Sequence, residues 1–558
     1  MFIGIDVGGT CTDAVLLDGS AVRATAKVET QDDLWISLGD ALDRLLKGIP
    51  GEKIERVVFS TTIVTNLIAE KKYDPVGVIL MPGPGRTFAD IRQQDDVYFL
   101  SGAIDYRGRE IIPLNKEEIK EALRWLESKG FKKIAVVGKF STRNNAHELE
   151  VADLIAKHHP DWQIEMGYRA GGKLNFPRRI ANTMLTCATR EKYHYFANAV
   201  RDAMDRRGIS GSVFILKADG GTLPLIASEQ VPVETIFSGP AASTLGVQAL
   251  TPPGETSMVV DIGGTTTDLA LILSGQPLLA SKGAKIGDRF TQVRALSVKA
   301  VPVGGDSVVE RVGRQFIIYS ERMGQAYCLG GPLPTPTDAL RVMGMTKLGD
   351  EDRAREAMEQ LGAPVGLSPM EVAHTIVNLV VDTVVAEIEQ MFKEWEREPA
   401  YRVWEVLQKK RLRPQNVVGV GGGALGFIPQ IAARMGCSPV LPPYAPVANA
   451  IGAAVAKPTL QVTLRADTER KIFSIEEEGY QGKLAGTLDE IGAVELAKEW
   501  LVKRAQKMNL TVEEIEITGK DVFNIVRDWK TTGRLYDISV QTPRGILGHI
   551  GSGGRLLK

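Results

Sequence analysis

The sequence predicts an α/β fold with two similar lobes around a cleft, followed by a small C-terminal α+β appendage. Strand and helix signals alternate along residues 1–250, which is typical of α/β proteins. One glycine-containing motif occurs twice, starting at Asp6 and at Asp261. That spacing is far too long for a stacked repeat and indicates two facing domains. Beyond about residue 460 the glycine motifs stop and charged residues increase, so we expect domains at 1–180, 181–460 and 461–558.

The repeated motif predicts a strand, a tight glycine turn and a second strand. The first copy runs from Asp6 to Asp13 and reads DVGGTCTD, and the second runs from Asp261 to Asp268 and reads DIGGTTTD. Apolar runs flank both copies, as in buried hairpins. A single Gly-Gly pair is explained well enough as a turn, but two near-identical copies favour a common chemical role.

The residue types in this motif favour phosphate binding. Paired glycines bring backbone N–H groups close to an anion, and neighbouring threonine hydroxyls add donors. A lysine does not follow the glycines, and a strand rather than a helix does, so the motif is neither a P-loop nor a dinucleotide fingerprint. The expected phosphate-binding residues are Gly8, Gly9, Thr10, Thr12, Gly263, Gly264, Thr265 and Thr266.

Asp6 and Asp261 stand at the ends of the strands that precede these turns. A carboxylate faces phosphate only when a cation lies between them, and Mg²⁺ is commonly held by one or two carboxylates, water and substrate phosphates. We therefore expect Asp6 and Asp261 to act as metal ligands and catalytic residues. The two hairpins would hold the phosphate tail of one nucleotide from both sides.

Further polar and glycine-rich segments are candidates for the same cleft. Gly421, Gly422 and Gly423 follow the strand-like run 417–420 and form a third candidate nucleotide element. Short polar side chains gather at Thr61, Thr62, Thr65 and Asn66, which either cap a helix or line a cleft. Asp219 with Gly220 is either a turn or a cleft residue. The remaining substrate-cleft candidates are Ser238, Gly239 and Asp306; Ser238 lacks the nucleophile-elbow pattern and suits a helix start.

Several elements carry local start or stop signals. Asn115 with Glu118 predicts a helix to Lys129 that ends at Gly130. The segment 368–371 predicts the start of a long helix towards Trp395. The runs 238–250 and 448–454 are rich in small residues, and the second is narrow enough to pack closely. The proline-rich segment 328–338 is expected to be a non-helical loop.

Composition excludes some partners and favours a cytoplasmic enzyme. The 558 residues carry a formal charge of −1 with 44% hydrophobic residues, so neither nucleic acid nor a membrane surface is an expected partner. Four scattered cysteines without a CxxC pair suit a reducing compartment. The start is strand-like and no signal-type stretch is visible. The most apolar helical run, 375–388, is too short to span a bilayer.

Taken together, these motifs resemble those of the hydantoinase A / 5-oxoprolinase family, within the superfamily of actin-like ATPases, sugar kinases and heat-shock chaperones. The resemblance covers roughly residues 2–455. It rests on the two glycine hairpins and on six further segments: 60–66, 238–242, 304–305, 330–332, 336–338 and 421–423. Cys11 stands where relatives commonly carry Phe, and is expected to be a packed side chain rather than a nucleophile. Gly305-Asp306-Ser307 is more acidic than the usual triple glycine before serine.

The resemblance implies two RNase H-like lobes hinged around ATP and Mg²⁺, with Gly421–Gly423 on the adenosine side. It implies an ATP-dependent hydrolase that activates a cyclic amide or a related carbonyl compound by phosphorylation. The alternatives are an ATPase subunit of a ketone carboxylase, a non-catalytic ATPase or reactivator module acting on a partner protein, and a small-molecule kinase. A hydantoinase B-like second subunit and self-association remain open, as does the exact substrate.

Overall fold

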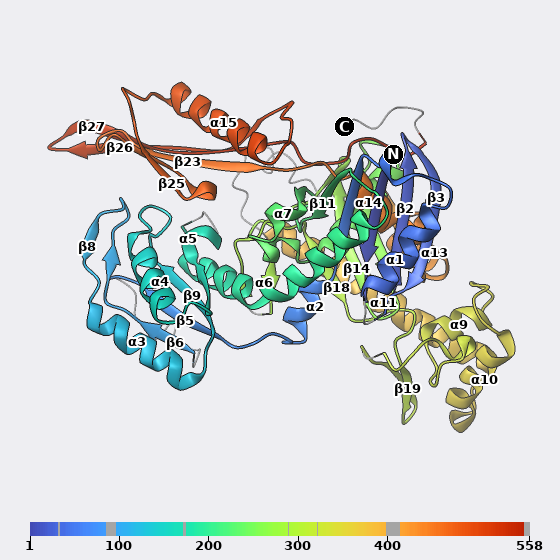
Figure 1. Cartoon of the computed structure of the whole chain (residues 1–558). Coiled ribbons are helices and arrows are strands. Elements are labelled where there is room, and N and C mark those ends of the chain that lie inside the picture. The colour runs from blue at the N-terminus through green and yellow to red at the C-terminus, as the bar shows by residue number, and fades with distance from the viewer. Residues whose placement is uncertain are drawn as a thin grey trace.

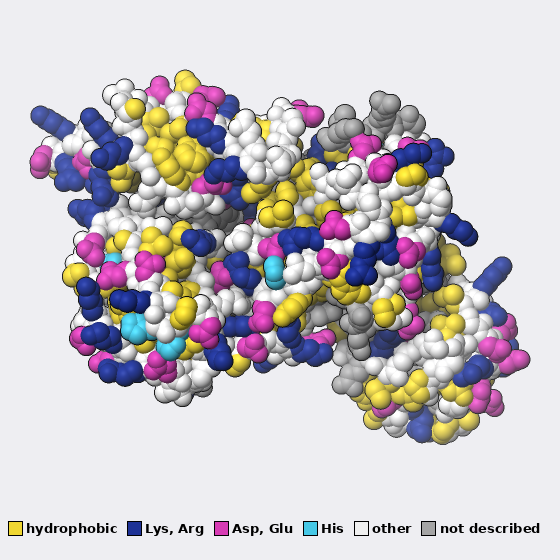
Figure 2. Space-filling view, viewed as in Figure 1, with side chains coloured by type: hydrophobic (Ala, Val, Ile, Leu, Met, Phe, Trp, Pro, Cys, Tyr) yellow, Lys and Arg dark blue, Asp and Glu magenta, His cyan; other side chains and the backbone are white. Residues whose placement is uncertain are grey.

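A computed structural model of the chain describes residues 1–9, 11–31, 34–84, 96–170, 174–287, 289–320, 322–397 and 413–551. Two mixed sheets form its centre, and smaller units extend from it (Figure 1). In the described residues, no helix has the length and apolar character needed to cross a membrane. Acidic and basic side chains are interspersed over the face shown in Figure 2.

The first central sheet has the strand order β12-β11-β4-β1-β2-β3. β1 runs parallel to β4 and antiparallel to β2. Helices α1 (Leu34–Leu45) and α6 (Phe176–Asp205) contribute apolar side chains to its core. Two of its strands lie beyond residue 180, so the sheet does not end at the expected domain boundary. Its strands are β1 (Phe2–Val7), β2 (Cys11–Asp18), β3 (Ala21–Glu29), β4 (Arg56–Thr61), β11 (Ser212–Leu216) and β12 (Thr222–Pro224).

The second central sheet repeats this arrangement. β13 runs antiparallel to β14 and parallel to β21, and Asp261 is paired with Asp268 across the hairpin as Asp6 is with Asp13. This repetition confirms the prediction of two similar lobes. The sheet contains β13 (Ser257–Ile262), β14 (Thr267–Leu273), β15 (Gln276–Pro277), β18 (Val298–Val301), β21 (Asn416–Val420) and β22 (Ser438–Val440), with α11 (Pro369–Arg397) and α13 (Ala424–Met435) in its core.

Two helices of small residues, α8 (Ser238–Leu250) and α14 (Ala448–Val455), pack against each other between the sheets. A Cβ atom at Gly246 would lie 1.9 Å from the Ala448 carbonyl oxygen, and one at Gly452 would lie 1.9 Å from that of Ala242. Glycine is therefore needed at both crossings, because any side chain would force the two backbones apart. The prediction that residues 448–454 form a closely packed helix is confirmed.

A separate four-stranded sheet extends from the first lobe at the lower left of Figure 1. Helix α3 (Lys116–Lys129) of this unit begins and ends as predicted, since Asn115 accepts from the Glu117 amide and Gly130 is left-handed. The other elements are β5 (Val76–Met81), β6 (Val97–Phe99), β7 (Ala103–Ile104), β8 (Glu110–Ile112), β9 (Lys133–Gly138), β10 (Gln163–Met166), α4 (Ala146–His158) and α5 (Gly167–Ala170).

A second extension, at the lower right of Figure 1, contains β19 (Val309–Val312), β20 (Gln315–Ile318), α9 (Pro336–Val342) and α10 (Glu351–Gly362). The prediction of a non-helical loop over 328–338 is wrong at its end, because α9 starts at Pro336. Proline suits the first turn of a helix, where its missing N–H is not needed. Thr335 and Asp338 complete a reciprocal capping box there.

The C-terminal unit is α+β, as expected, and its first strand begins at Gln461. A five-stranded sheet carries the helix α15 (Glu490–Lys507). The chain then returns to the first lobe, where Leu547 packs with residues of β1 and β2. The strands are β23 (Gln461–Asp467), β24 (Ile472–Ile475), β25 (Tyr480–Lys483), β26 (Glu516–Arg527) and β27 (Lys530–Gln541); the short elements elsewhere are α2 (Ile63–Ala69), α7 (Leu225–Ser228), β16 (Lys285–Ile286) and β17 (Arg289–Phe290).

Candidate functional site

The two glycine hairpins have the same local geometry. The Gly8 amide donates to the Cys11 carbonyl at 3.1 Å, and the Gly263 amide donates to the Thr266 carbonyl at 2.9 Å. Each turn follows a strand that is buried in the middle of its sheet. Thr10 lies outside the described residues. The matched turns present two similar sets of backbone groups, one from each lobe.

The carboxylates that precede these turns influence one another across the lobes. Burial raises the pKa of Asp6 to about 6, and the charges of Asp13 and Asp261 contribute to the increase. Burial likewise raises the pKa of Asp261, again with a contribution from Asp13. The pKa of Asp268 rises to about 7 because of burial and the charge of Asp261. The four carboxylates thus repel one another electrostatically, with Asp6 and Asp13 buried and Asp261 and Asp268 partly exposed.

The two small-residue helices each supply a polar partner to this group. Asn449 of α14 donates through Nδ2 to Asp6 Oδ2 at 2.6 Å and to Asp13 Oδ2 at 3.1 Å. Ser243 of α8 donates to Asp261 Oδ2. The sequence analysis missed Asn449 and Ser243, although a polar residue in a helix of alanine and glycine is a visible signal.

The donor set fits a divalent cation. Asp6 Oδ1 is buried and has no hydrogen-bond partner among the described residues, so a carboxylate oxygen is left for a further ligand. No cluster of three or more metal-ligating side chains occurs in the part of the chain that the structure describes. Mg²⁺ does not require one, because one or two carboxylates, water and nucleotide phosphates usually complete its coordination.

Lys27 forms an ion pair with this group, and the sequence analysis missed it. Its Nζ lies 2.7 Å from Asp13 Oδ1. The charges of Asp13 and Asp261 raise the pKa of Lys27 in spite of its partial burial. Lys27 is therefore a charged group between the two hairpins.

The third glycine segment lies against the second hairpin. Gly421 has a φ of +83°, and a Cβ atom there would lie 2.4 Å from Asp261 Oδ1. The Gly423 amide donates to the Ile262 carbonyl at 3.1 Å. Nothing lies within 4 Å of a Cβ atom built on Gly422, whereas one on Gly423 would lie 2.6 Å from the Ile262 side chain, so only Gly422 of the three faces open space.

Asp306 also lies at the second hairpin. Its amide donates to the Gly264 carbonyl at 2.7 Å, and its carboxylate pairs with Arg322 at 3.1 Å. The charge of Arg322 also lowers the pKa of Cys11 in the first hairpin, so this arginine acts on residues of both hairpins. Burial nevertheless raises the pKa of the Cys11 thiol, and a protonated thiol is a poor nucleophile.

The threonine cluster joins the first hairpin to the start of α8. The Ser238 hydroxyl donates to the Thr61 carbonyl at 2.9 Å, and the Phe237 amide donates to Thr65 Oγ1 at 3.1 Å. Thr62 donates to the Val7 carbonyl at 3.3 Å. A Cβ atom on Gly9 would lie 3.8 Å from Asn66 Nδ2, and one on Gly239 the same distance from the Thr62 methyl group. Much of the cluster's hydrogen-bonding capacity is thus used within the protein.

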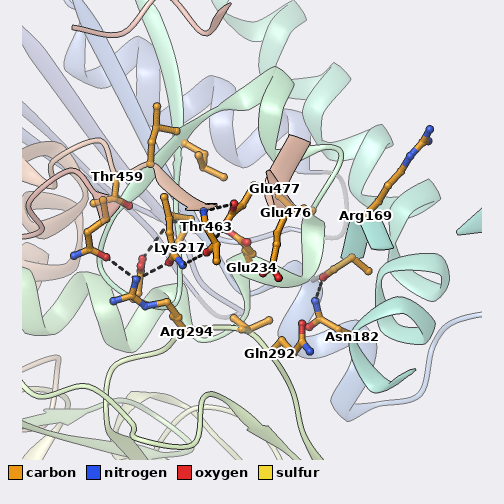
Figure 3. A pocket seen from close by; sticks show the side chains of 18 of the residues that line it. Arg169, Asn182, Lys217, Glu234, Gln292, Arg294, Thr459, Thr463, Glu476 and Glu477 are labelled. Atoms are coloured by element: carbon orange, nitrogen blue, oxygen red, sulfur yellow. Dashed lines mark hydrogen bonds and ion pairs between the residues drawn. The ribbon is translucent and has the colours of Figure 1, made fainter. Parts of the chain in front are cut away.

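Asp219 and Gly220 lie in the turn between β11 and β12. Asp219 accepts from the Gly221 amide at 3.0 Å and lines a cavity that extends to the C-terminal unit (Figure 3). Burial alone would raise the pKa of Asp219, but Lys217 and Arg294 lower it overall. Asp219 therefore belongs to a different charged environment, formed with Lys217 and Arg294, and not to the carboxylate group of the hairpins.

Comparisons with known proteins agree with this geometry. A profile described as hydantoinase/oxoprolinase matches residues 179–462, and one described as the hydantoinase/oxoprolinase N-terminal region matches residues 2–159. The acetophenone carboxylase gamma subunit of Aromatoleum aromaticum is 26% identical over 70% of this chain and 60% of its own length. The caprolactamase subunit alpha of Pseudomonas jessenii is 23% identical over 79% of this chain and 68% of its own length.

The chain thus spans only about 60% of the length of the carboxylase subunit that it matches. A nucleotide-free structure of acetone carboxylase, from a study of ATP-dependent acetone carboxylation, has a TM-score of 0.74 at 16% identity. It covers 98% of this chain, and the alignment includes 87% of that chain. The likeness in fold therefore extends beyond residue 462 into the C-terminal unit.

Proposed function

The chain belongs to the hydantoinase/oxoprolinase family, and from this premise we propose that it is an ATP-dependent hydrolase that activates a cyclic amide or a related carbonyl compound. The observation that carries the proposal is the pair of matched hairpins whose carboxylates influence each other's pKa. The names of relatives support it, since one is a caprolactamase subunit and a structural neighbour concerns ATP-dependent carboxylation.

In this proposal the backbone amides of both glycine turns bind the β- and γ-phosphates. Asp6 and Asp261 would hold Mg²⁺, which neutralises phosphate charge and orients the nucleotide when bound. Asn449 and Ser243 fix the orientation of these two carboxylates. Catalysis of phosphoryl transfer is then mainly positioning and electrostatic stabilisation.

Phosphorylation of the substrate's carbonyl oxygen would convert an unreactive amide into one that water can open. Lys27 lies close enough to Asp13 and Asp261 for their charges to act on it, and it would offset negative charge as phosphate moves. The glycine segment 421–423, in which Gly422 faces open space, is the proposed adenosine side.

The test is ADP release from the purified chain with Mg²⁺-ATP and a panel of lactams, hydantoins, 5-oxoproline and small ketones. Stimulation by a cyclic amide together with a ring-opened product supports the proposal. A stable phosphorylated product, without opening, would instead identify a small-molecule kinase. Stimulation only by a partner protein would identify a reactivator module.

An ATPase subunit of a ketone carboxylase is the second candidate, favoured by the match to an acetophenone carboxylase subunit. Relatives named as subunits also support a requirement for a second polypeptide such as a hydantoinase B-like chain. The same panel, repeated with that chain and bicarbonate, separates the two. Carboxylated product from a ketone, with no turnover of any cyclic amide, would favour the carboxylase.

A further inference from the structure

A polar cavity of about 150 Å³ lies where the first lobe, helix α6 and the C-terminal unit meet (Figure 3). Its wall includes Asp219 after β11, Glu476 after β24 and Arg504 of α15. β11 is separated from β1 by β4 alone, so the two strands lie about 10 Å apart at the usual strand spacing. The cavity is therefore near the glycine hairpins but has a lining of its own.

One side of the cavity carries positive charge that its carboxylates only partly match. Lys217 Nζ lies 3.6 Å from Asp219 and 3.9 Å from Glu234, both longer than a hydrogen bond. Arg294 donates to the side-chain oxygens of Gln461 and Gln541 and has no carboxylate within 4.0 Å among the described residues. Both cations act on the single buried carboxylate of Asp219. This side is suited to a ligand carboxylate.

Another part of the wall carries buried acceptors without partners. Glu476 is 5% exposed, and its Oε1 makes no hydrogen bond in the described structure; Arg465 is its ion-pair partner, at 3.5 Å. The neighbouring Glu477, by contrast, accepts from the amide and the hydroxyl of Thr463.

Asn182 Oδ1 and Thr459 Oγ1, both on residues only 3% exposed, also lack hydrogen-bond partners within the described residues. Buried polar atoms without partners cost free energy. A ligand with N–H donors would satisfy them. Burial raises the pKa of Glu476 well above its ordinary value, although the charges of Arg465 and Arg179 act in the opposite direction.

We propose that this cavity binds a small zwitterionic amino acid, with its carboxylate at Lys217 and Arg294 and its ammonium group at Glu476 and Asn182 (Figure 3). The assignment of the ligand class rests on the proposed function, because opening a cyclic amide leaves an amine and a carboxylate on one molecule. The site would thus recognise the ring-opened product and not the lactam, which carries neither charge.

The binding experiment is calorimetry of the full chain with 6-aminohexanoate and L-glutamate as probes. Hexanoate, hexylamine and caprolactam lack one or both charges and serve as matched control ligands. We expect at least one zwitterion to bind at least tenfold more tightly than all three controls. Equal affinity for a zwitterion and hexanoate, or no binding of either zwitterion, would overturn the proposal.

Substitutions test the assigned contacts. Arg294→Gln and Glu476→Gln should each weaken zwitterion binding at least tenfold, provided that circular dichroism and the thermal transition show a folded protein. Arg169→Gln is the control, because Arg169 belongs to the same wall but points away from the cavity in Figure 3. Unchanged affinity in both folded test variants would refute the site.

One further readout separates this inference from the proposed function. Asp261→Asn should keep zwitterion affinity within twofold while ATP turnover is lost. Zwitterion binding by a chain that opens no cyclic amide would leave the site standing and remove the proposed function; ring opening without zwitterion binding would do the reverse.

Discussion

Asp6→Asn should make the protein more stable at neutral pH while removing ATP turnover. Asp6 is 6% exposed, and burial with the nearby charges of Asp13 and Asp261 raises its pKa from 3.8 to about 6. The folded state therefore binds a proton more readily than the unfolded state between these pH values. For a carboxyl group shifted in this direction, stability falls as pH rises through the window, and the loss is complete above it.

The size of the effect follows from the shift. A change of about two pKa units corresponds to about 3 kcal/mol at neutral pH, since one unit is worth about 1.4 kcal/mol. The substituted asparagine at position 6 has nearly the shape of aspartate and no charge. The hydrogen bond that Asn449 donates to position 6 is weaker in the variant, because its acceptor is then a neutral amide oxygen. We therefore expect a net gain of about 1–3 kcal/mol at pH 8, and a gain smaller by about 1 kcal/mol at pH 5.

The assay is the midpoint of thermal or urea unfolding of the nucleotide-free chain at pH 5 and pH 8, with ADP release measured in parallel. Asp18→Asn is the control, because it removes a charge at the exposed end of the same hairpin, where Asp18 pairs with Arg23. A variant at Asp6 that is less stable than wild type at pH 8, or a difference that does not change with pH, would refute the reasoning. Wild-type ATP turnover in this variant would refute the metal role.

The remaining predictions concern the second hairpin, the packing of the lobes and the Asp306 pair. Asp261→Asn should lower ATP turnover at least about 100-fold, measured as ADP release, whereas exposed Asp521→Asn should leave it unchanged. Gly4→Ala should destabilise the fold by about 3 kcal/mol, because the new Cβ would lie 1.9 Å from the Ala450 carbonyl; Gly486→Ala, in open space, is the control in the same unfolding assay. Arg322→Ala should weaken Mg²⁺-ATP binding about tenfold, because the charge of Asp306 is then uncompensated at the second hairpin. Adding Asp306→Gly to that variant should restore the affinity for Mg²⁺-ATP. An affinity that does not recover would contradict this role of Arg322.

The hairpins could be predicted from the sequence because every residue that shapes them is local. A buried strand, two glycines and a second strand lie within about a dozen residues, and the repeat made the common role visible. The start of α3 and its end at Gly130 were equally local. The helix at Pro336 was missed for a different reason: proline was taken as a helix breaker where it acts as a first-turn residue.

The partners of the hairpin carboxylates could not be predicted in the same way. Asn449 bonds to Asp6 across 443 residues of chain. Lys27 faces Asp13 across the local β2–β3 hairpin, but the effect of Asp261 on it depends on the packing of the two lobes. Long-range pairing also explains why the first sheet continues past the boundary expected at residue 180. β11 pairs with β4, although the four-stranded sheet lies between them in the sequence. Local patterns identify strands, but they do not specify which parallel neighbour a strand takes.

The two small-residue helices, α8 and α14, carry the polar residues that bond to the hairpin carboxylates. Glycine at 246 and 452 lets the backbones of α8 and α14 touch, and this contact fixes where Ser243 and Asn449 stand. Ser243 bonds to the carboxylate of one hairpin and Asn449 to that of the other. Sliding of α8 or α14 against the strand that carries its carboxylate would therefore lengthen one of these bonds and change the charge balance at Asp6 or Asp261. Glycine at these crossings thus serves the chemistry as well as the packing, because a wider separation of the helices would withdraw both donors from the carboxylates that need them.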